Sequence, residues 1–189
     1  MQIWVGLGNP GPRYALHRHN VGFMVMDVLA EMHGFGPEQK KFQGWAREGR
    51  IAGHKVLLLK PATFMNESGR SVGEALRFYK LGTDHLTVFH DELDLAPFKV
   101  KVKQGGGTAG HNGLKSIDQH LGAEFRRVRI GIGHPGHKDR VTGHVLGNYA
   151  KAEQDDLVAM LGAIGAAAEW LADGDAPRFM SDVALKMQV

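Results

Sequence analysis

The fold is decided by a stretch near the amino end, Ile3–Asn20, which reads I-W-V-G-L-G-N-P-G-P-R-Y-A-L-H-R-H-N. Its apolar, β-branched beginning followed by glycines and prolines is typical of a buried strand that ends in a tight loop. Open α/β sheets bind ligands at the carboxyl ends of such strands, so Asn9 and His19 are candidates for chemistry. The alternative is a turn with two surface histidines, His17 and His19, since loops also need glycine, proline and asparagine for backbone reasons.

Two glycine patterns match a dinucleotide-binding fingerprint, G-L-G-N-P-G at Gly6–Gly11 and G-I-G-H-P-G at Gly131–Gly136. That fingerprint requires a helix that begins at the glycines and receives a pyrophosphate. After the first pattern the sequence has no helical apolar period. The fingerprint also requires an acidic residue about twenty positions later, at the end of a second strand, whereas Asp27 lies inside an amphipathic pattern. We therefore interpret both patterns as turns and predict no cofactor.

The composition predicts a single domain spanning residues 1–189. A chain of 189 residues with 43% hydrophobic content is long enough for one buried core and short for two domains. No apolar run is long enough to cross a membrane and no charged-then-apolar leader is present, so we expect a soluble, cytoplasmic protein. The chain has no cysteine, and none of its serines lies in a G-x-S-x-G elbow, so a hydrolase of this sequence would use water as its nucleophile.

Charge is distributed unevenly along the chain, although the net charge is only +3. From Pro97 to Arg129, seven basic residues stand against two acidic ones, a local balance of +5. From Lys151 to Val189, three basic residues stand against seven acidic ones, a balance of −4. This asymmetry predicts a polyanionic partner that contacts the middle of the chain. A solvated face is the alternative.

Strand-like and helix-like segments alternate along most of the sequence. Short apolar or alternating runs predict strands over 3–7, 42–51, 56–60, 86–89, 98–103 and 128–132. Amphipathic periods predict helices over 21–33, 113–121 and 150–172. They also predict a helix that ends at Tyr79 and a short terminal helix that begins at Pro177. The segments 36–41 and 133–144 are interpreted as a connector and a polar loop. The alternation predicts an α/β fold with a twisted, mostly parallel (mixed) sheet and helices on both faces.

Polar side chains that could bind a metal follow the apolar run 86–89. They are His90, Asp91, Glu92 and Asp94. Carboxylate oxygens at such spacing suit hard metal ions. Asp and Glu at the end of a strand also form caps and turns or contact solvent without binding a metal. The residues alone leave both interpretations open.

The segment 98–115 combines a basic strand with a glycine-rich loop. The lysines at 99, 101 and 103 alternate with valines, so their ammonium groups share one face, which can follow a phosphate backbone or keep an edge strand from aggregating. The loop G-G-G-T-A-G-H-N-G-L-K at Gly105–Lys115 places four glycines before His111 and Asn112. Such glycines allow close approach of the backbone to a ligand, and a flexible linker is the alternative.

Several segments together resemble the bacterial peptidyl-tRNA hydrolase family. They are G-L-G-N-P-G at Gly6–Gly11, R-H-N-V-G at Arg18–Gly22, F-M-N-E-S-G at Phe64–Gly69, H-D-E-L-D-L at His90–Leu95, G-G-G-T-A-G-H-N-G-L-K-S at Gly105–Ser116 and R-I-G-I-G-H-P-G at Arg129–Gly136. Their joint order and the chain length fit the family from end to end. One departure is Glu67, where leucine or another non-acidic residue is expected.

The resemblance implies a monomeric, metal-independent enzyme that cleaves the ester between a nascent peptide and the terminal ribose of tRNA, which recycles tRNA after abortive translation. By motif position, the implied catalytic residues are His19 as the base, Asp91 as its partner and Asn9 as a polar group that holds the substrate. The implied substrate-binding residues are Tyr14, Phe64, Met65, Asn66, His111 and Asn112. The tRNA backbone would meet Lys101, Lys103 and Arg129.

The chemistry of these residue types agrees with ester hydrolysis. An unperturbed histidine titrates at about pH 6.5, so a neutral His19 can take a proton from water, and a carboxylate such as Asp91 can fix its tautomer. Asparagine side chains or glycine-loop amides can stabilise the oxyanion, and the residues do not say which asparagine does so. Two alternatives remain, a metal-dependent phosphoesterase that uses the cluster at 90–94 and a tRNA-binding module without catalysis.

Overall fold

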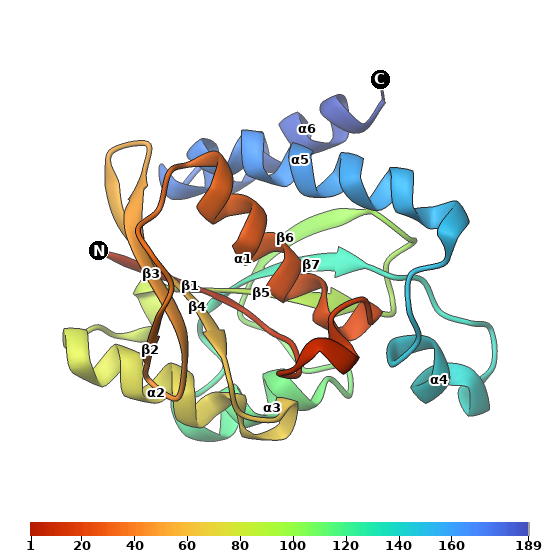
Figure 1. The fold of residues 1–189 in the computed structure, drawn as a ribbon, viewed down its shortest axis with the longest axis horizontal. Helices are drawn as coiled ribbons and strands as arrows, with labels where there is room; N and C mark the ends of the chain where they lie inside the picture. Colours follow the sequence, from red (N-terminus) through yellow and green to blue (C-terminus); the bar gives the residue numbers. More distant parts are fainter. Residues whose placement is uncertain (189) are drawn as a thin grey trace.

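Seven strands form one sheet in the computed structural model, which describes residues 1–188 (Figure 1). In spatial order they are β2 (Gln39–Lys41), β3 (Gly44–Ile51), β4 (His54–Pro61), β1 (Gln2–Gly6), β5 (Leu86–Glu92), β7 (Arg126–Gly131) and β6 (Val100–Gln104). The central strands β4, β1, β5 and β7 are parallel, and the pairs β2–β3, β3–β4 and β7–β6 are antiparallel. The predicted α/β fold with a mixed sheet is confirmed, and its parallel part is the centre of the sheet.

Helices cover both faces of this sheet (Figure 1). One face carries α1 (Val21–Met32), α5 (Gln154–Ala172) and α6 (Ala176–Met187), and the other carries α2 (Ser68–Tyr79) and α3 (Asn112–Leu121). The short helix α4 (Val141–Val145) lies apart from both layers, at the rim of the molecule (Figure 1). Across residues 1–188, no helix combines the length and apolar character needed to cross a membrane.

The core follows from the alternation of side chains along the central strands. In β1, Trp4 packs with the α1 and α5 layer, and its ring centroid lies 5.6 Å from that of Phe89. Its neighbours Ile3 and Val5 pack with the α2 and α3 layer. All four side chains are 0% exposed. Burying each of them stabilises the fold by roughly 1.5–3 kcal/mol, so the period of two fixes which face of the strand meets which helices.

Some predicted element boundaries are wrong, for reasons visible in the structure. The strand predicted over 86–89 continues as β5 through Glu92, because the parallel pairing with β7 extends to the end of this segment. The predicted connector 36–41 contains the edge strand β2. The polar loop predicted over 133–144 contains the 3-10 turn Lys138–Arg140 and most of α4. The helix predicted from 150 begins as α5 at Gln154, after another 3-10 turn.

Glycines bring the start of α1 directly against the carboxyl ends of β1 and β5. A Cβ at Gly22, the second residue of α1, would lie 2.5 Å from the Phe89 carbonyl oxygen, and a Cβ at Gly6 would overlap the Gly22 carbonyl oxygen. These glycines therefore allow backbone contacts within the protein. As a consequence, the turn that precedes α1 and carries His19 lies at the end of β5.

Candidate active site

His19 lies on the 3-10 turn Arg18–Asn20, which leads directly into α1. The next side chain, Asn20, anchors this turn to the loop after β1. Its Oδ1 accepts a hydrogen bond from the Asn9 amide at 2.9 Å, and its Nδ2 donates to the Asn9 carbonyl at 2.9 Å. His19 is only 7% exposed. The two segments together therefore hold its imidazole in a defined position.

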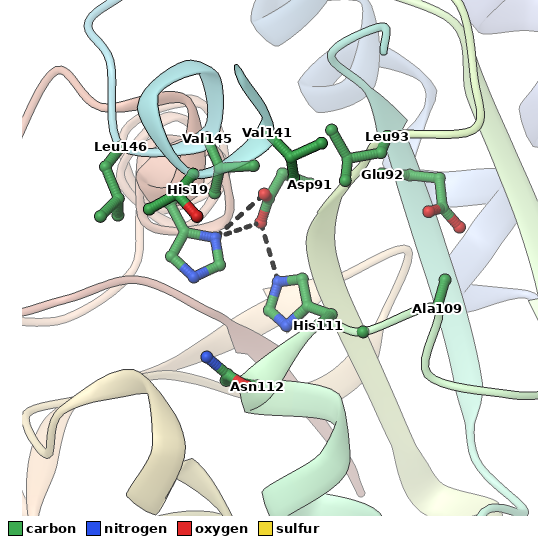
Figure 2. Close-up of a pocket in the computed structure, with 12 residues that line it drawn as sticks. His19, Asp91, Glu92, Leu93, Ala109, His111, Asn112, Val141, Val145 and Leu146 are labelled. Carbon is green, nitrogen blue, oxygen red and sulfur yellow. Dashed lines mark hydrogen bonds and ion pairs between the residues drawn. The ribbon is translucent and has the colours of Figure 1, made fainter. Parts of the chain in front are cut away.

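Asp91, near the end of β5, joins His19 to a second histidine, His111 (Figure 2). Nδ1 of His19 lies 3.0 and 2.9 Å from the two carboxylate oxygens, and Nε2 of His111 lies 2.8 Å from one of them. The centroids of the two imidazoles are 4.8 Å apart. Side chains from the turn before α1, from β5 and from the loop before α3 thus meet at the carboxyl edge of the sheet.

The tautomer of His111 follows from its place as the N-cap residue of α3. Its Nδ1 accepts hydrogen bonds from the amides of Gly113 and Leu114, at 3.1 and 3.3 Å. Because a backbone amide only donates, Nδ1 carries no proton, and Nε2 donates to Asp91. Both ring nitrogens of His111 are therefore engaged within the protein.

Asp91 remains a carboxylate and fixes the tautomer of His19. Burial raises the pKa of the Asp91 carboxyl, but the attraction of His111 and His19 outweighs burial and holds that pKa well below its usual range. A carboxylate only accepts hydrogen bonds, so Nδ1 of His19 carries a proton. In the neutral imidazole Nε2 is then a free acceptor, and among residues 1–188 no group bonds to it. This is the arrangement of a general base.

His90 packs beneath this group and is 2% exposed. Its Nδ1 donates to the Asp91 carbonyl at 2.9 Å, and its ring lies edge-on to that of His111 with 5.3 Å between centroids. Burial, assisted by the nearby His111, lowers the pKa of His90 to about 3. His90 therefore supports His111 without adding a charge near neutral pH.

Replacing His90 by glutamine is expected to weaken the dependence of stability on pH. The pKa of His90 is about 3 in the folded chain and 6.5 in the unfolded one, so below 6.5 the unfolded state binds the extra proton and stability falls as pH falls. From pH 7.5 to 5.5 this costs about 1 kcal/mol. In urea denaturation, the free energy of unfolding should fall by about 1 kcal/mol less in His90→Gln than in the unsubstituted protein. Equal falls in both would contradict a buried neutral His90.

A cavity of about 250 Å³ opens beside the imidazole of His19. Its polar side is formed by His19, Asp91, His111 and Asn112. Its other side is apolar and is formed by Leu93, Val141, Val145 and Leu146. Figure 2 shows these apolar side chains on one side of the paired imidazoles and Asn112 on the other. The cavity therefore offers one ligand a base, hydrogen-bonding groups and an apolar wall.

Comparison with known proteins identifies the family. A sequence profile of the family described as peptidyl-tRNA hydrolase matches residues 3–188. The chain belongs to the peptidyl-tRNA hydrolase family. The resemblance carried by the motifs is thereby confirmed, and with it the expected class of enzyme, a hydrolase.

Relatives match the chain along its whole length. The peptidyl-tRNA hydrolase of Erythrobacter litoralis is 77% identical over 188 residues, with 100% of both chains covered. That of Novosphingobium aromaticivorans is 78% identical over 188 residues, which cover 100% of this chain and 98% of the relative. A crystal structure of peptidyl-tRNA hydrolase from Acinetobacter baumannii is 43% identical, covers 97% of this chain and 94% of that chain, and superposes with a TM-score of 0.90. The peptidyl-tRNA hydrolase fold thus extends over the described chain.

Four of the residues predicted for a peptidyl-tRNA hydrolase site line the cavity together, and Asn9, which is not among the lining residues, bonds to the turn that carries His19. The four are His19, Asp91, His111 and Asn112. Asn9 is tied to Asn20 and also to the loop after β4, because its Oδ1 accepts the Met65 amide at 2.9 Å. That bond orients the side-chain amide of Asn9. Its Nδ2 has no partner among residues 1–188 and is available to donate.

The other predicted substrate-binding residues lie outside the lining of this cavity. Tyr14 packs edge-on against His17 with 5.4 Å between ring centroids. Phe64 is 62% exposed, and Asn66 is exposed on the 3-10 turn before α2. Met65 is only 4% exposed, so its side chain supports the site from the core instead of offering a binding surface.

The predicted tRNA-contacting residues form one basic surface. Antiparallel pairing places Lys101 opposite Arg129 and Lys103 opposite Arg127, so the four side chains share one face of β6 and β7. Three of them, Lys103, Arg127 and Arg129, line a second cavity of about 190 Å³. Nε of Arg129 donates to the Glu92 carboxylate at 2.9 Å, which partly neutralises this surface.

The residues at 90–94 do not form a shared metal site, which corrects that alternative. Asp91 points to His19, whereas His90 bonds to backbone and Glu92 pairs with Arg129. Asp94 is exposed. Among residues 1–188, the group with metal-ligand character is instead His19, Asp91 and His111, whose ligand atoms lie within 4.8 Å of one another.

Sequence reasoning missed several residues that support the site. Arg127, 2% exposed, donates to the Gly107 carbonyl and so anchors the glycine-rich loop to β7. Its place directly before the strand predicted over 128–132 was the available signal. Arg18 bonds to the last turn of α4 and so holds this helix beside the cavity. The sequence indicated this role only through the position of Arg18 next to His19. The apolar residues of α4 gave no local signal, because the segment is polar and short.

Proposed function

We propose that this chain hydrolyses the ester bond of peptidyl-tRNA with a water molecule activated by His19, and so returns free tRNA to translation in the cytoplasm. The observation that carries the proposal is the pairing of Nδ1 of His19 with the buried Asp91 carboxylate, which leaves Nε2 without a partner beside the cavity among residues 1–188. We further propose that residues 1–189 act as one domain and as a monomer.

In the proposed reaction, water attacks the ester carbonyl carbon while its proton passes to Nε2 of His19. The Asp91 carboxylate stabilises the imidazolium that forms and stays ionised, because the pKa of its carboxyl is held low. When the tetrahedral intermediate collapses, the bond between the carbonyl carbon and the ribose oxygen breaks. That oxygen takes the proton from His19, so the products are a peptide acid and a tRNA with a free terminal hydroxyl.

Of the two histidines on Asp91, only His19 suits the role of base. Nδ1 of His111 is occupied by two amides of α3, and its Nε2 proton is directed at Asp91. Protonation of Nδ1 of His111 would break these two hydrogen bonds at the N-terminus of α3. His111 therefore serves to hold the carboxylate in place.

Asparagine side chains are the proposed donors to the oxyanion. Nδ2 of Asn9 is oriented by the bond between Oδ1 and the Met65 amide, and Asn112 lies on the polar side of the cavity. A neutral amide stabilises developing negative charge without competing as a base. Tyr14, Phe64 and Asn66 lie around the same edge, and we propose that they contact the peptide or the tRNA end.

The experiment that tests this function is incubation of the protein with N-blocked aminoacyl-tRNA after exhaustive chelation. Release of free tRNA is the expected result. Tight, salt-dependent binding with an intact ester would favour a binding module without catalysis. Activity that returns only with added divalent metal would favour a metal mechanism held by His19, Asp91 and His111.

The basic surface on β6 is proposed to bind the tRNA backbone, and Lys101→Ala with Lys103→Ala tests it. Each lost phosphate contact should reduce the slope of log affinity against log salt by about 0.7 to 0.9. Hydrolysis of a short ester without the tRNA body should barely change. The matched control is Lys40→Ala with Lys41→Ala, which removes the same charge from β2 at the opposite edge of the sheet. Equal slopes in the β6 variant and the unsubstituted protein would show that tRNA docks elsewhere.

A further inference from the structure

The apolar wall of the catalytic cavity is not part of the hydrophobic core. Val141 and Val145 of α4, with Leu146 after it, form most of this wall. None of the five residues of α4 is buried, and the helix lies outside both helical layers (Figure 1). Packing in the core therefore does not fix the distance between this wall and His19. Hydrogen bonds must do so instead.

Backbone bonds join the segment after α4 to the segment before His19. His17 and Asn148 form an antiparallel bridge. On either side of it, the Arg18 amide donates to the Gly147 carbonyl at 3.0 Å, and the Tyr149 amide donates to the Leu16 carbonyl at 3.1 Å. The wall and the turn that carries the base are thus paired directly, although about 130 residues separate them in the sequence.

The Arg18 side chain adds a second set of contacts, at the two ends of the segment 144–153. Its Nη1 donates to the His144 carbonyl in the last turn of α4 at 3.1 Å, and its Nη2 pairs with the Glu153 carboxylate just before α5 at 2.7 Å. The guanidinium also lies over the ring of Tyr149, 5.6 Å from its centroid. The side chain is 13% exposed, so these contacts are largely shielded from water.

The residue opposite the guanidinium must be small. A Cβ at Gly147 would lie 3.1 Å from Nη1 of Arg18 and 2.7 Å from the Gly143 carbonyl oxygen. The absence of a side chain at this position lets the guanidinium reach the carbonyl of α4. Lysine could keep only part of these contacts, because a single ammonium group does not span a carbonyl and a carboxylate in a fixed plane.

We propose that Arg18 is a positioning residue for hydrolysis, which holds the apolar wall of α4 at a fixed distance from the base on the neighbouring residue. This inference rests on the proposed function and adds a residue to it. Arg18 touches neither Asp91 nor the free nitrogen of His19. Its loss should therefore loosen the contact between the substrate and the wall and leave proton transfer largely intact.

The first test compares kinetic constants of Arg18→Gln with those of the unsubstituted protein. Loss of two charge-assisted hydrogen bonds should raise KM about tenfold, while kcat falls less than about threefold. Arg18→Lys should recover part of the loss. The matched control is Arg47→Gln, because Arg47 also pairs with a glutamate, Glu38, but on β3 away from the site. A fall in kcat at unchanged KM would overturn the proposal.

The second test measures coupling between Arg18 and the wall. Val145→Ala should raise KM about fivefold when Arg18 is present, and less than about twofold in the Arg18→Gln background, where the wall is no longer held. Independent effects of the two substitutions would overturn the proposal. If Arg18→Gln does not fold, Glu153→Gln removes one anchor and should show the same coupling in weaker form. Absence of turnover in the unsubstituted protein would refute the proposed function, whereas normal turnover with independent effects would refute this inference alone.

Discussion

Replacing His19 by alanine is expected to lower kcat by about 10² or more and to leave the affinity for tRNA almost unchanged. The loss is confined to proton transfer, because Nε2 of His19 is the free acceptor beside the cavity, while the bond between His111 and Asp91 does not depend on it. Hydrolysis of N-blocked aminoacyl-tRNA gives kcat, and equilibrium binding of deacylated tRNA gives the affinity. Near-normal kcat would rule out His19 as the base.

His54→Ala is the matched control for this prediction. His54 also pairs with an aspartate, and its Nε2 lies 2.8 Å from Oδ1 of Asp173. This pair is largely exposed and lies at the amino end of β4, whereas the cavity lies at the carboxyl edge of the sheet. The control variant should keep kcat within about twofold, because it removes the same type of pair without touching the cavity.

The sequence could predict that the segments after β1 and β5 meet at one edge of the sheet, because this depends only on strand direction. The strand pattern at 3–7 and the apolar run at 86–89 indicate parallel strands, and parallel strands bring their carboxyl ends to one edge. Strand direction therefore agrees with the pairing of His19 and Asp91, which the resemblance to the family implied and which the residues alone left open. The predicted helix after His111 begins one residue earlier than expected, at Asn112, and so makes His111 its N-cap.

The supporting interactions could not be predicted, because they join segments distant in the sequence without a local pattern. The polar end of β5 resembles a loop, but it continues as strand because His90, Asp91 and Glu92 pair with Arg129, Ile130 and Gly131 of β7. In the same way, α4 is too short to show a sustained apolar stripe, and its position depends on Arg18 and on the His144 ring, which bonds to the Ile132 carbonyl at 2.8 Å. Glu67, the one departure from the family motif, lies at the N-cap position of α2, where an acidic side chain is favourable.

Asp91→Asn is also expected to lower kcat by about 10² or more, through a change of tautomer. The new side chain offers one oxygen and one NH₂ group to two imidazoles. His111 must receive the oxygen, because the amides of α3 fix its proton on Nε2. The NH₂ group is then directed at Nδ1 of His19, which becomes an acceptor, and the proton of His19 moves to Nε2. The imidazole now presents a proton to water and can no longer accept one.

Asp94→Asn is the matched control, since it removes the same charge three residues later from an exposed position and should change kcat by less than about threefold. Added divalent metal should not restore Asp91→Asn, because the lost partner served an imidazole. The tautomer argument also predicts coupling to His111. When His111→Phe is already present, the new amide is free to turn its oxygen toward His19, so the further loss from Asp91→Asn should be several-fold smaller, on the order expected for directly coupled residues. An undiminished loss would show that Asp91 acts by its charge and not by the tautomer that it selects.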